Sequence, residues 1–153
     1  MEPFVNSKIL IADDDNDHLI LFRRVIQQRF PEVEVAVVKD GQSLLHYIHL
    51  HPVDLLFLDL DLPDRTGFDC LQAIRKDPAV VDLPVVVYSG SAHLSDIQRS
   101  FLLHADFYLV KPFQLDHLVK ALDTILAFNW REQSPVRHHY FMNNRFVPFN
   151  FPD

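Results

Sequence analysis

One short apolar run constrains the fold of this chain more than any other feature. Leu55–Leu58 is apolar at every position, without the alternation of a strand that has one wet face, so we interpret it as a strand buried on both faces. Asp59 follows directly, and Pro63 and Gly67 then turn the chain. Asp59 either begins that turn and nothing more, or lies where open α/β sheets bind their ligands, beyond the carboxyl end of a buried strand.

The same strand-then-helix pattern occurs five times. The predicted strands are Lys8–Ala12, Glu32–Val38, Leu55–Leu58, Val85–Tyr88 and Phe107–Val110, and a helical pattern follows each of them. This order predicts an α/β fold with a parallel sheet, helices on both faces and right-handed crossovers. A length of 153 residues fits one core, and we assign residues 1–130 to this domain.

The last segment, residues 131–153, has a different composition. It is rich in aromatic residues, Asn and Pro, whereas disordered tails are normally poor in aromatic residues. Its prolines argue against a helix, so we predict an extended C-terminal arm rather than a second domain. Two options stay open for covering its rings: the arm folds back on its own domain, or it crosses to a second copy and forms a symmetric homodimer.

Composition excludes several functional classes. The net charge is −7 and no basic cluster occurs, which argues against nucleic acid as a partner. No apolar run reaches the roughly 18 residues of a membrane span. The first residues lack the apolar core of a signal peptide, and the single Cys70 cannot form an internal disulfide, so we expect a cytoplasmic protein.

Polar side chains follow four of the predicted strands. They are Asp13 and Asp14, Asp59, Ser89 and Lys111. Because the carboxyl ends of parallel strands meet at one edge of a sheet, these residues can converge at one site. Together they have what phosphoryl transfer to a carboxylate requires: Asp59 as nucleophile, Mg²⁺ on Asp14 and Asp59 with Asp13 through a water, and Lys111 and Ser89 on phosphoryl oxygens.

The acidic run around Asp13 and Asp14 also has a plain structural explanation. Asn16 or Asp17 is the expected cap of the first helix, and acids at a helix N-terminus are favourable. Capping does not explain why like charges crowd the strand end, and a divalent cation would relieve that repulsion. For the fourth helix, Ser95 or Asp96 is the expected cap.

Several segments together resemble the receiver domain of two-component response regulators over residues 6–128. They are Ile9–Asp15, Leu56–Pro63 with Gly67, Tyr88–Gly90 and Val110–Phe113. The resemblance implies a flavodoxin-like (βα)5 fold with strand order 2-1-3-4-5. It also implies a bacterial phosphorelay in which a sensor histidine kinase or phosphotransfer protein phosphorylates Asp59 with Mg²⁺. Tyr108 matches the family's switch aromatic, and Asp61 matches the residue whose backbone carbonyl joins the metal shell.

No output domain follows the receiver-like segment. The resemblance therefore implies a stand-alone regulator that acts through contacts with a downstream protein, and that catalyses only its own phosphorylation and dephosphorylation. Pro84–Val87 and Phe128–Trp130 resemble the single-domain regulators that partner bacterial phytochromes.

The alternative from another class is an enzyme. Leu58–Pro63 also resembles the D-x-D motif of haloacid-dehalogenase-type phosphatases, with Asp59 and Asp61 as its two acids. That motif usually opens the chain, whereas here two β-α units precede it. No acidic pair follows Lys111 to hold the magnesium of that family.

Overall fold

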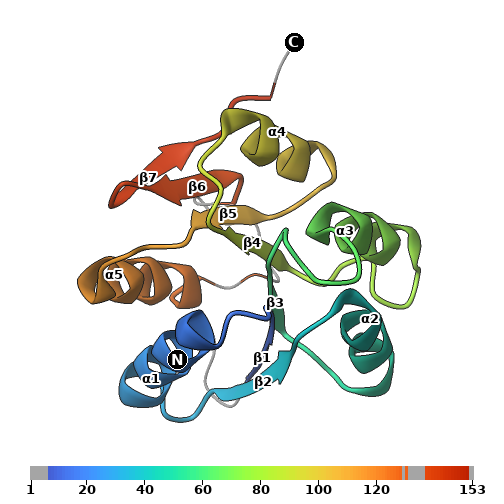
Figure 1. The fold of residues 1–153 in the computed structure, drawn as a ribbon, viewed down its shortest axis with the longest axis horizontal. Coiled ribbons are helices and arrows are strands. Elements are labelled where there is room, and N and C mark those ends of the chain that lie inside the picture. Colours follow the sequence, from blue (N-terminus) through green and yellow to red (C-terminus); the bar gives the residue numbers. More distant parts are fainter. Residues whose placement is uncertain (1–6, 129, 131–136, 152–153) are drawn as a thin grey trace.

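A seven-stranded sheet forms the centre of the molecule. The computed structural model describes residues 7–128, 130 and 137–151. The strands are β1 (Lys8–Ala12), β2 (Glu34–Val38), β3 (Leu55–Leu58), β4 (Val85–Ser89), β5 (Phe107–Val110), β6 (His139–Met142) and β7 (Arg145–Pro148). The helices are α1 (Asn16–Arg29), α2 (Gly41–Leu50), α3 (Gly67–Lys76), α4 (Leu94–Leu102) and α5 (Leu115–Leu126). The order is β2-β1-β3-β4-β5-β6-β7, with β1 to β5 parallel, so the predicted α/β fold is confirmed (Figure 1).

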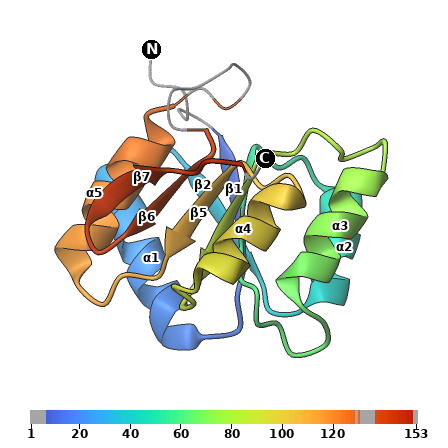
Figure 2. The same ribbon diagram turned by 90° about the horizontal axis from the view of Figure 1, so that it is seen from above.

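Helices cover both faces of the sheet, with α1 and α5 on one face and α2, α3 and α4 on the other (Figures 1 and 2). Strand β3 shows why its sequence does not alternate. Leu55 and Phe57 belong to the core under α1 and α5, while Leu56 and Leu58 belong to the opposite core, and all four are fully buried. Burying such a side chain contributes about 1.5–3 kcal/mol, so an apolar residue is favoured at each position.

The predicted caps of two helices are wrong. Helix α1 is capped by Asp15, not by Asn16 or Asp17. The Asp15 side chain accepts hydrogen bonds from the N–H groups of Asp17 and His18. Asp15 wins because it has the extended backbone that a capping residue requires, whereas Asn16 is already helical.

Helix α4 likewise begins earlier than predicted. Its first turn follows His93, which makes no side-chain capping bond, so neither Ser95 nor Asp96 is the cap. The carboxylate of Asp96 instead accepts a 2.5 Å hydrogen bond from the hydroxyl of Ser91, in the loop before the helix. This acid is therefore used to hold the β4–α4 loop.

The predicted C-terminal arm is extended, and it forms a hairpin that the sequence did not indicate. Of residues 131–153, the segments 131–136 and 152–153 lie outside the described residues. Strand β6 pairs in parallel with β5, and β7 pairs antiparallel with β6. The turn is Asn143–Asn144, with φ of 53° and 61°, which are the left-handed values of a type I′ hairpin.

The hairpin continues both hydrophobic cores of its own domain. Phe146 lies 5.9 Å from Phe107 between ring centroids, on the face covered by α5. Phe149 stacks on Phe101 of α4 at 4.6 Å, on the opposite face. Of the two options left open by the sequence, the structure shows the arm packed on its own domain.

Strand β7 makes a poor edge for further pairing. The N–H of Phe149 donates to the carbonyl of His138, which fixes the alternation of the β6–β7 ladder. The backbone N–H and C=O groups of Phe146 and the C=O of Pro148 therefore face the outer edge of the sheet, where Pro148 has no N–H to donate. This arrangement disfavours dimers that form by adding strands edge to edge.

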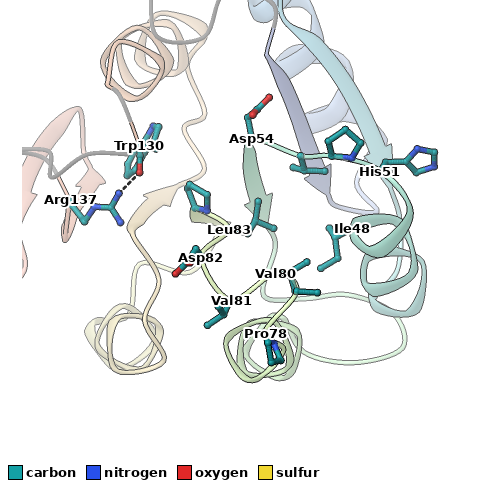
Figure 3. Close-up of a pocket in the computed structure, with 14 residues that line it drawn as sticks. Ile48, His51, Asp54, Pro78, Val80, Val81, Asp82, Leu83, Trp130 and Arg137 are labelled. Carbon is teal, nitrogen blue, oxygen red and sulfur yellow. Dashed lines mark hydrogen bonds between the residues drawn. The ribbon is translucent and has the colours of Figure 1, made fainter.

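A pocket of about 780 Å³ lies at the amino edge of the sheet, where β3 and β4 begin (Figure 3). Asp54, Leu83 and Trp130 are among its lining residues, and the carbonyl of Trp130 accepts a 2.6 Å hydrogen bond from Arg137. It lies at the edge opposite to the predicted site, at the carboxyl ends of the strands. None of the described helices is long and apolar enough to cross a membrane.

A buried carboxylate ties the arm to the domain. Asp106, 7% exposed, accepts hydrogen bonds from the N–H of Val85 at 2.8 Å and from Arg75 at 3.1 Å, and it pairs with Arg137. The N–H of His138 donates to the Asp106 carbonyl at 2.8 Å. One side chain thus links α3, β4 and the start of the hairpin.

We expect Asp106→Asn to lower the free energy of unfolding by about 3 kcal/mol, because it leaves two partly buried guanidinium groups without their buried, charged partner. Urea unfolding measures the change. The matched control is Asp123→Asn, whose carboxylate pairs with Arg29 at a partly exposed position and whose loss should change stability far less. Equal losses in the two variants would contradict the role assigned to Asp106.

Candidate functional site

Strand alternation sorts the predicted site residues onto two faces. Every second residue of a strand faces the same side of the sheet, so Asp13 lies on the α1/α5 face with Ile9 and Ile11 of β1. By the same alternation, Asp59 after β3 and Lys111 after β5 lie on that face too. All three lie at the carboxyl ends of their strands, as predicted. Ser89 and Tyr108 share the opposite face, which α4 covers.

The ammonium group of Lys111 lies between two buried carboxylates. Its Nζ is 2.8 Å from Asp13 Oδ2 and 3.0 Å from Asp59 Oδ2. Asp13 is 0% exposed, Asp59 5% and Lys111 8%. Burial raises the pKa of Asp59 to about 6, although Lys111 lowers it. Burial alone would lower the pKa of Lys111, but the two carboxylates outweigh it and raise that pKa.

The acids at this edge fit a divalent cation. Asp13, Asp14 and Asp59 each offer a carboxylate oxygen, and these oxygens lie within 4.8 Å of one another. Asp13 Oδ2 is buried and lies 2.8 Å from Lys111 Nζ, a contact that uses only part of its capacity as an acceptor. Three hard oxygen donors, one of them exposed on Asp14, form the donor set that Mg²⁺ prefers.

Asp61 lies beside this cluster with its side chain exposed. Its N–H donates to Asp59 Oδ1 at 3.2 Å. Asp61 and Thr66 form a local antiparallel bridge, in which the N–H of Gly67 donates to the carbonyl of Leu60. The carbonyl of Asp61 does not take part in that hydrogen bond. The role of the Asp61 carbonyl in the metal shell stays a prediction.

Gly67 is required by the close approach of two backbone segments. A Cβ at this position would lie 2.3 Å from the carbonyl oxygen of Asp59 and 2.8 Å from Cα of Leu60. Any side chain would therefore push the β3–α3 loop away from the end of β3. The turn glycine recognised in the sequence thus fixes the backbone that carries Asp59.

Ser89 and Tyr108 are linked through the β4–α4 loop. Ser89 is fully buried, and its hydroxyl accepts a hydrogen bond from the N–H of Ser91 at 3.1 Å. The Tyr108 hydroxyl donates to the Ser91 carbonyl at 2.9 Å, and burial raises the pKa of Tyr108 to about 12. Both side chains therefore hold the same loop, on the face opposite to Lys111.

Tyr88 is a site residue that the sequence analysis did not single out. Its ring lies below Lys111, with Nζ 5.3 Å from the ring centroid. The alternation of side chains along a strand could have identified it. Counting in steps of two along each strand puts Tyr88 on the same face of the sheet as Asp59 and Lys111.

Comparison with known proteins identifies the family. A model of the response regulator receiver domain matches residues 9–123. The chain belongs to this family. It is 28% identical over 133 residues to the probable methanogenesis regulatory protein FilR2 of Methanothrix harundinacea, covering 83% of this chain and 84% of that protein. The chain spans between 28% and 56% of the length of several other curated relatives.

Two solved receivers are similar over nearly their whole length. The phosphorylated cyanobacterial phytochrome response regulator RcpA is 30% identical, with a TM-score of 0.72, and the match covers 78% of this chain and 91% of RcpA. The Mn²⁺-bound response regulator Rcp1 is 27% identical, with a TM-score of 0.73 and coverages of 84% and 97%. The receiver prediction is therefore confirmed, and the phosphatase alternative finds no support in these comparisons.

The raised pKa of Asp59 makes the stability of the folded protein depend on pH. The carboxyl group of Asp59 has a pKa of about 6 in the folded protein, against 3.8 for an unperturbed Asp. The contribution of protonated Asp59 to the free energy of unfolding is therefore lost as the pH rises through 6. We expect Asp59→Asn to stabilise the metal-free protein by about 1–3 kcal/mol at pH 7. Thermal unfolding in a chelator should show this advantage shrinking toward pH 4.5.

The control for this test is Asp116→Asn, which changes an exposed acid in the first turn of α5. It should show no comparable dependence on pH. Added Mg²⁺ should narrow the gap between wild type and Asp59→Asn, because the cation stabilises the form that keeps its ligands. An Asp59→Asn protein that is less stable than wild type at pH 7 without Mg²⁺ would overturn this interpretation.

Proposed function

We propose that the protein is a phosphorelay receiver that accepts a phosphoryl group on Asp59 and signals through protein contacts. The observation that carries this proposal is one cluster: a carboxylate at the end of β3, 3.0 Å from a buried ammonium group and within 4.8 Å of two further acids. The similar receivers RcpA, which is phosphorylated, and Rcp1, which is Mn²⁺-bound, support a phosphoryl acceptor and a divalent-cation site in this chain.

In the proposed reaction a carboxylate oxygen of Asp59 attacks phosphorus. The new O–P bond forms as the bond from phosphorus to the leaving nitrogen of a phosphohistidine, or to the leaving oxygen of an acyl phosphate, breaks with its electron pair. A pKa of about 6 leaves Asp59 mostly ionised at neutral pH, as a nucleophile must be. Lys111 stays charged, so its ammonium group can follow the negative charge onto a phosphoryl oxygen.

Asp13, Asp14 and Asp59 would hold Mg²⁺, together with the backbone carbonyl of Asp61. When bound, the cation neutralises charge on the transferred phosphoryl group. When no cation is bound, the ammonium group of Lys111 neutralises part of the negative charge of the site, since it lies 2.8 Å from Asp13 and 3.0 Å from Asp59.

The donor would be a sensor histidine kinase or a phosphotransfer protein, and the reaction would take place in the cytoplasm. Beside the site, Phe113 follows Lys111 by two residues and is 99% exposed. An exposed aromatic ring next to the acceptor is suited to contact with a protein donor. The downstream partner would also be a protein.

Ser89 and Tyr108 would carry the change outward. A hydroxyl of Ser89 drawn to the phosphoryl group would release the N–H of Ser91, whose carbonyl holds Tyr108. Tyr108 is paired in register with Tyr140 of the hairpin. We therefore treat residues 131–153 as an arm of the receiver rather than a domain of its own, placed to sense the state of β5.

The proposal is tested by labelling with acetyl phosphate. Intact mass should show addition of one phosphoryl group in the presence of Mg²⁺, and this addition should disappear in Asp59→Asn and in excess chelator. Asp116→Asn, the exposed control, should be labelled like wild type. Full labelling of Asp59→Asn would overturn the assignment of the acceptor, and labelling that survives chelation would remove the metal requirement.

A homodimer formed by the C-terminal arm is the second proposal about partners. Pro148 blunts the outer edge of β7, so exchange of arms is the favoured route to such a dimer, because each arm would keep the contacts that it makes on its own domain. Light scattering should show a dimer for the full chain and a monomer after truncation behind Trp130. A full chain that is monomeric at high concentration would rule out the exchanged arm.

A further inference from the structure

Tyr88 lies under the acidic site rather than at its rim. It is 1% exposed, and its ring contacts Phe22 at 5.8 Å and Phe57 at 6.2 Å between centroids, in the core under α1 and α5. The residue therefore has the surroundings of an ordinary core aromatic on one side. Its other side faces the charged groups at the end of the sheet.

Lys111 lies against that second side. Its Nζ is 5.3 Å from the centroid of the Tyr88 ring, within the distance at which a ring attracts a cation. The same Nζ contacts Asp13 and Asp59, so three groups hold it. Burial and the charges of Asp13 and Asp59 raise the pKa of Tyr88, which therefore stays a neutral phenol beside the ammonium group.

We propose that Tyr88 is a positioning residue that holds the ammonium group of Lys111 at the acceptor carboxylate through the face of its ring, an inference that rests on the proposed phosphorylation of Asp59. An ammonium group has three N–H donors, and the two carboxylates accept at most two of them in the resting site. The ring attracts the charge without taking a hydrogen bond. A third N–H thus stays available for a phosphoryl oxygen.

The ring has a second advantage over another carboxylate. Attraction to a ring face varies slowly with lateral position, so Lys111 can move from Asp59 toward a phosphoryl oxygen without losing this support. A further acid in place of Tyr88 would hold Lys111 more firmly, but it would add negative charge where the phosphoryl group must enter.

The contact itself can be measured without metal or phosphoryl donor. The ε-methylene protons of Lys111 should show an upfield ring-current shift in wild type and in Tyr88→Phe, and lose it in Tyr88→Leu. Lys111→Met assigns the resonance by its absence. Lys8, whose Nζ lies 5.1 Å from the ring centroid of Tyr47, is the internal control and should keep its shift in wild type and in all three variants.

The positioning role is tested by the rate at which acetyl phosphate and Mg²⁺ label Asp59. Tyr88→Leu should slow labelling about tenfold, equivalent to about 1.4 kcal/mol, while Tyr88→Phe should retain most of the rate. The decisive comparison is made in the Lys111→Met background, where Tyr88→Leu should have no further effect because the group that it positions is absent.

Three results would overturn the proposal. An equal slowing by Tyr88→Leu with and without Lys111 would show a general packing defect. A loss in Tyr88→Phe as large as in Tyr88→Leu would assign the effect to the hydroxyl instead of the ring. An unshifted Lys111 in the wild-type spectrum would show that the contact does not form. Wild-type protein that is not labelled at Asp59 at all refutes the proposed function instead, and the spectra still decide the Tyr88–Lys111 contact.

Discussion

One ammonium group between two buried carboxylates is the interaction on which the site of this receiver depends. Asp13 and Asp59 carry two negative charges into the carboxyl edge of the sheet, and Lys111 cancels one of them. Burial is the main reason why the pKa of Asp59 rises to about 6, and the negative charge of Asp13 adds to that rise, while Lys111 opposes it. A site with excess negative charge attracts a cation, and the exposed Asp14 offers a carboxylate oxygen within 4.8 Å of those of Asp13 and Asp59.

Because side chains alternate along the parallel strands, the charged site residues and the two hydroxyl residues lie on opposite faces of the sheet. Charged groups that would handle a phosphoryl group lie on the α1/α5 face, whereas Ser89 and Tyr108 lie on the α4 face. Any change at Asp59 must cross the sheet to reach α4. Ser89 is suited to this crossing because its strand β4 lies between β3, which leads to Asp59, and β5, which carries Tyr108.

Local pattern was enough to predict the central sheet and the positions of Asp13, Asp59 and Lys111. The reason is that a strand buried on both faces must be continuously apolar, and a polar residue directly after it marks the sheet edge. Pattern could not predict the hairpin, because Asn143–Asn144 has no glycine and His139–Met142 is too short to show alternation. It also missed Tyr88, since an aromatic residue inside an apolar strand has the appearance of core until its neighbours across the sheet are known. Capping of α1 by Asp15 depends on where the extended backbone ends, which sequence alone does not determine.

The hairpin changes what the outer part of the sheet can do. Strand β5 would otherwise present an unpaired edge, and β6 covers it while Phe146 and Phe149 extend the cores on both faces. Asp106 holds the start of this hairpin with the same carboxylate that holds the first residue of β4. The two ends of the β4–β5 pair therefore have different contacts. Asp106 links the amino end to the arm, whereas Lys111 links the carboxyl end to Asp13 and Asp59, and Ser89 holds the β4–α4 loop. Strands β4 and β5 are only five and four residues long, so a shift of either strand at one end would be resisted by the contacts at the other.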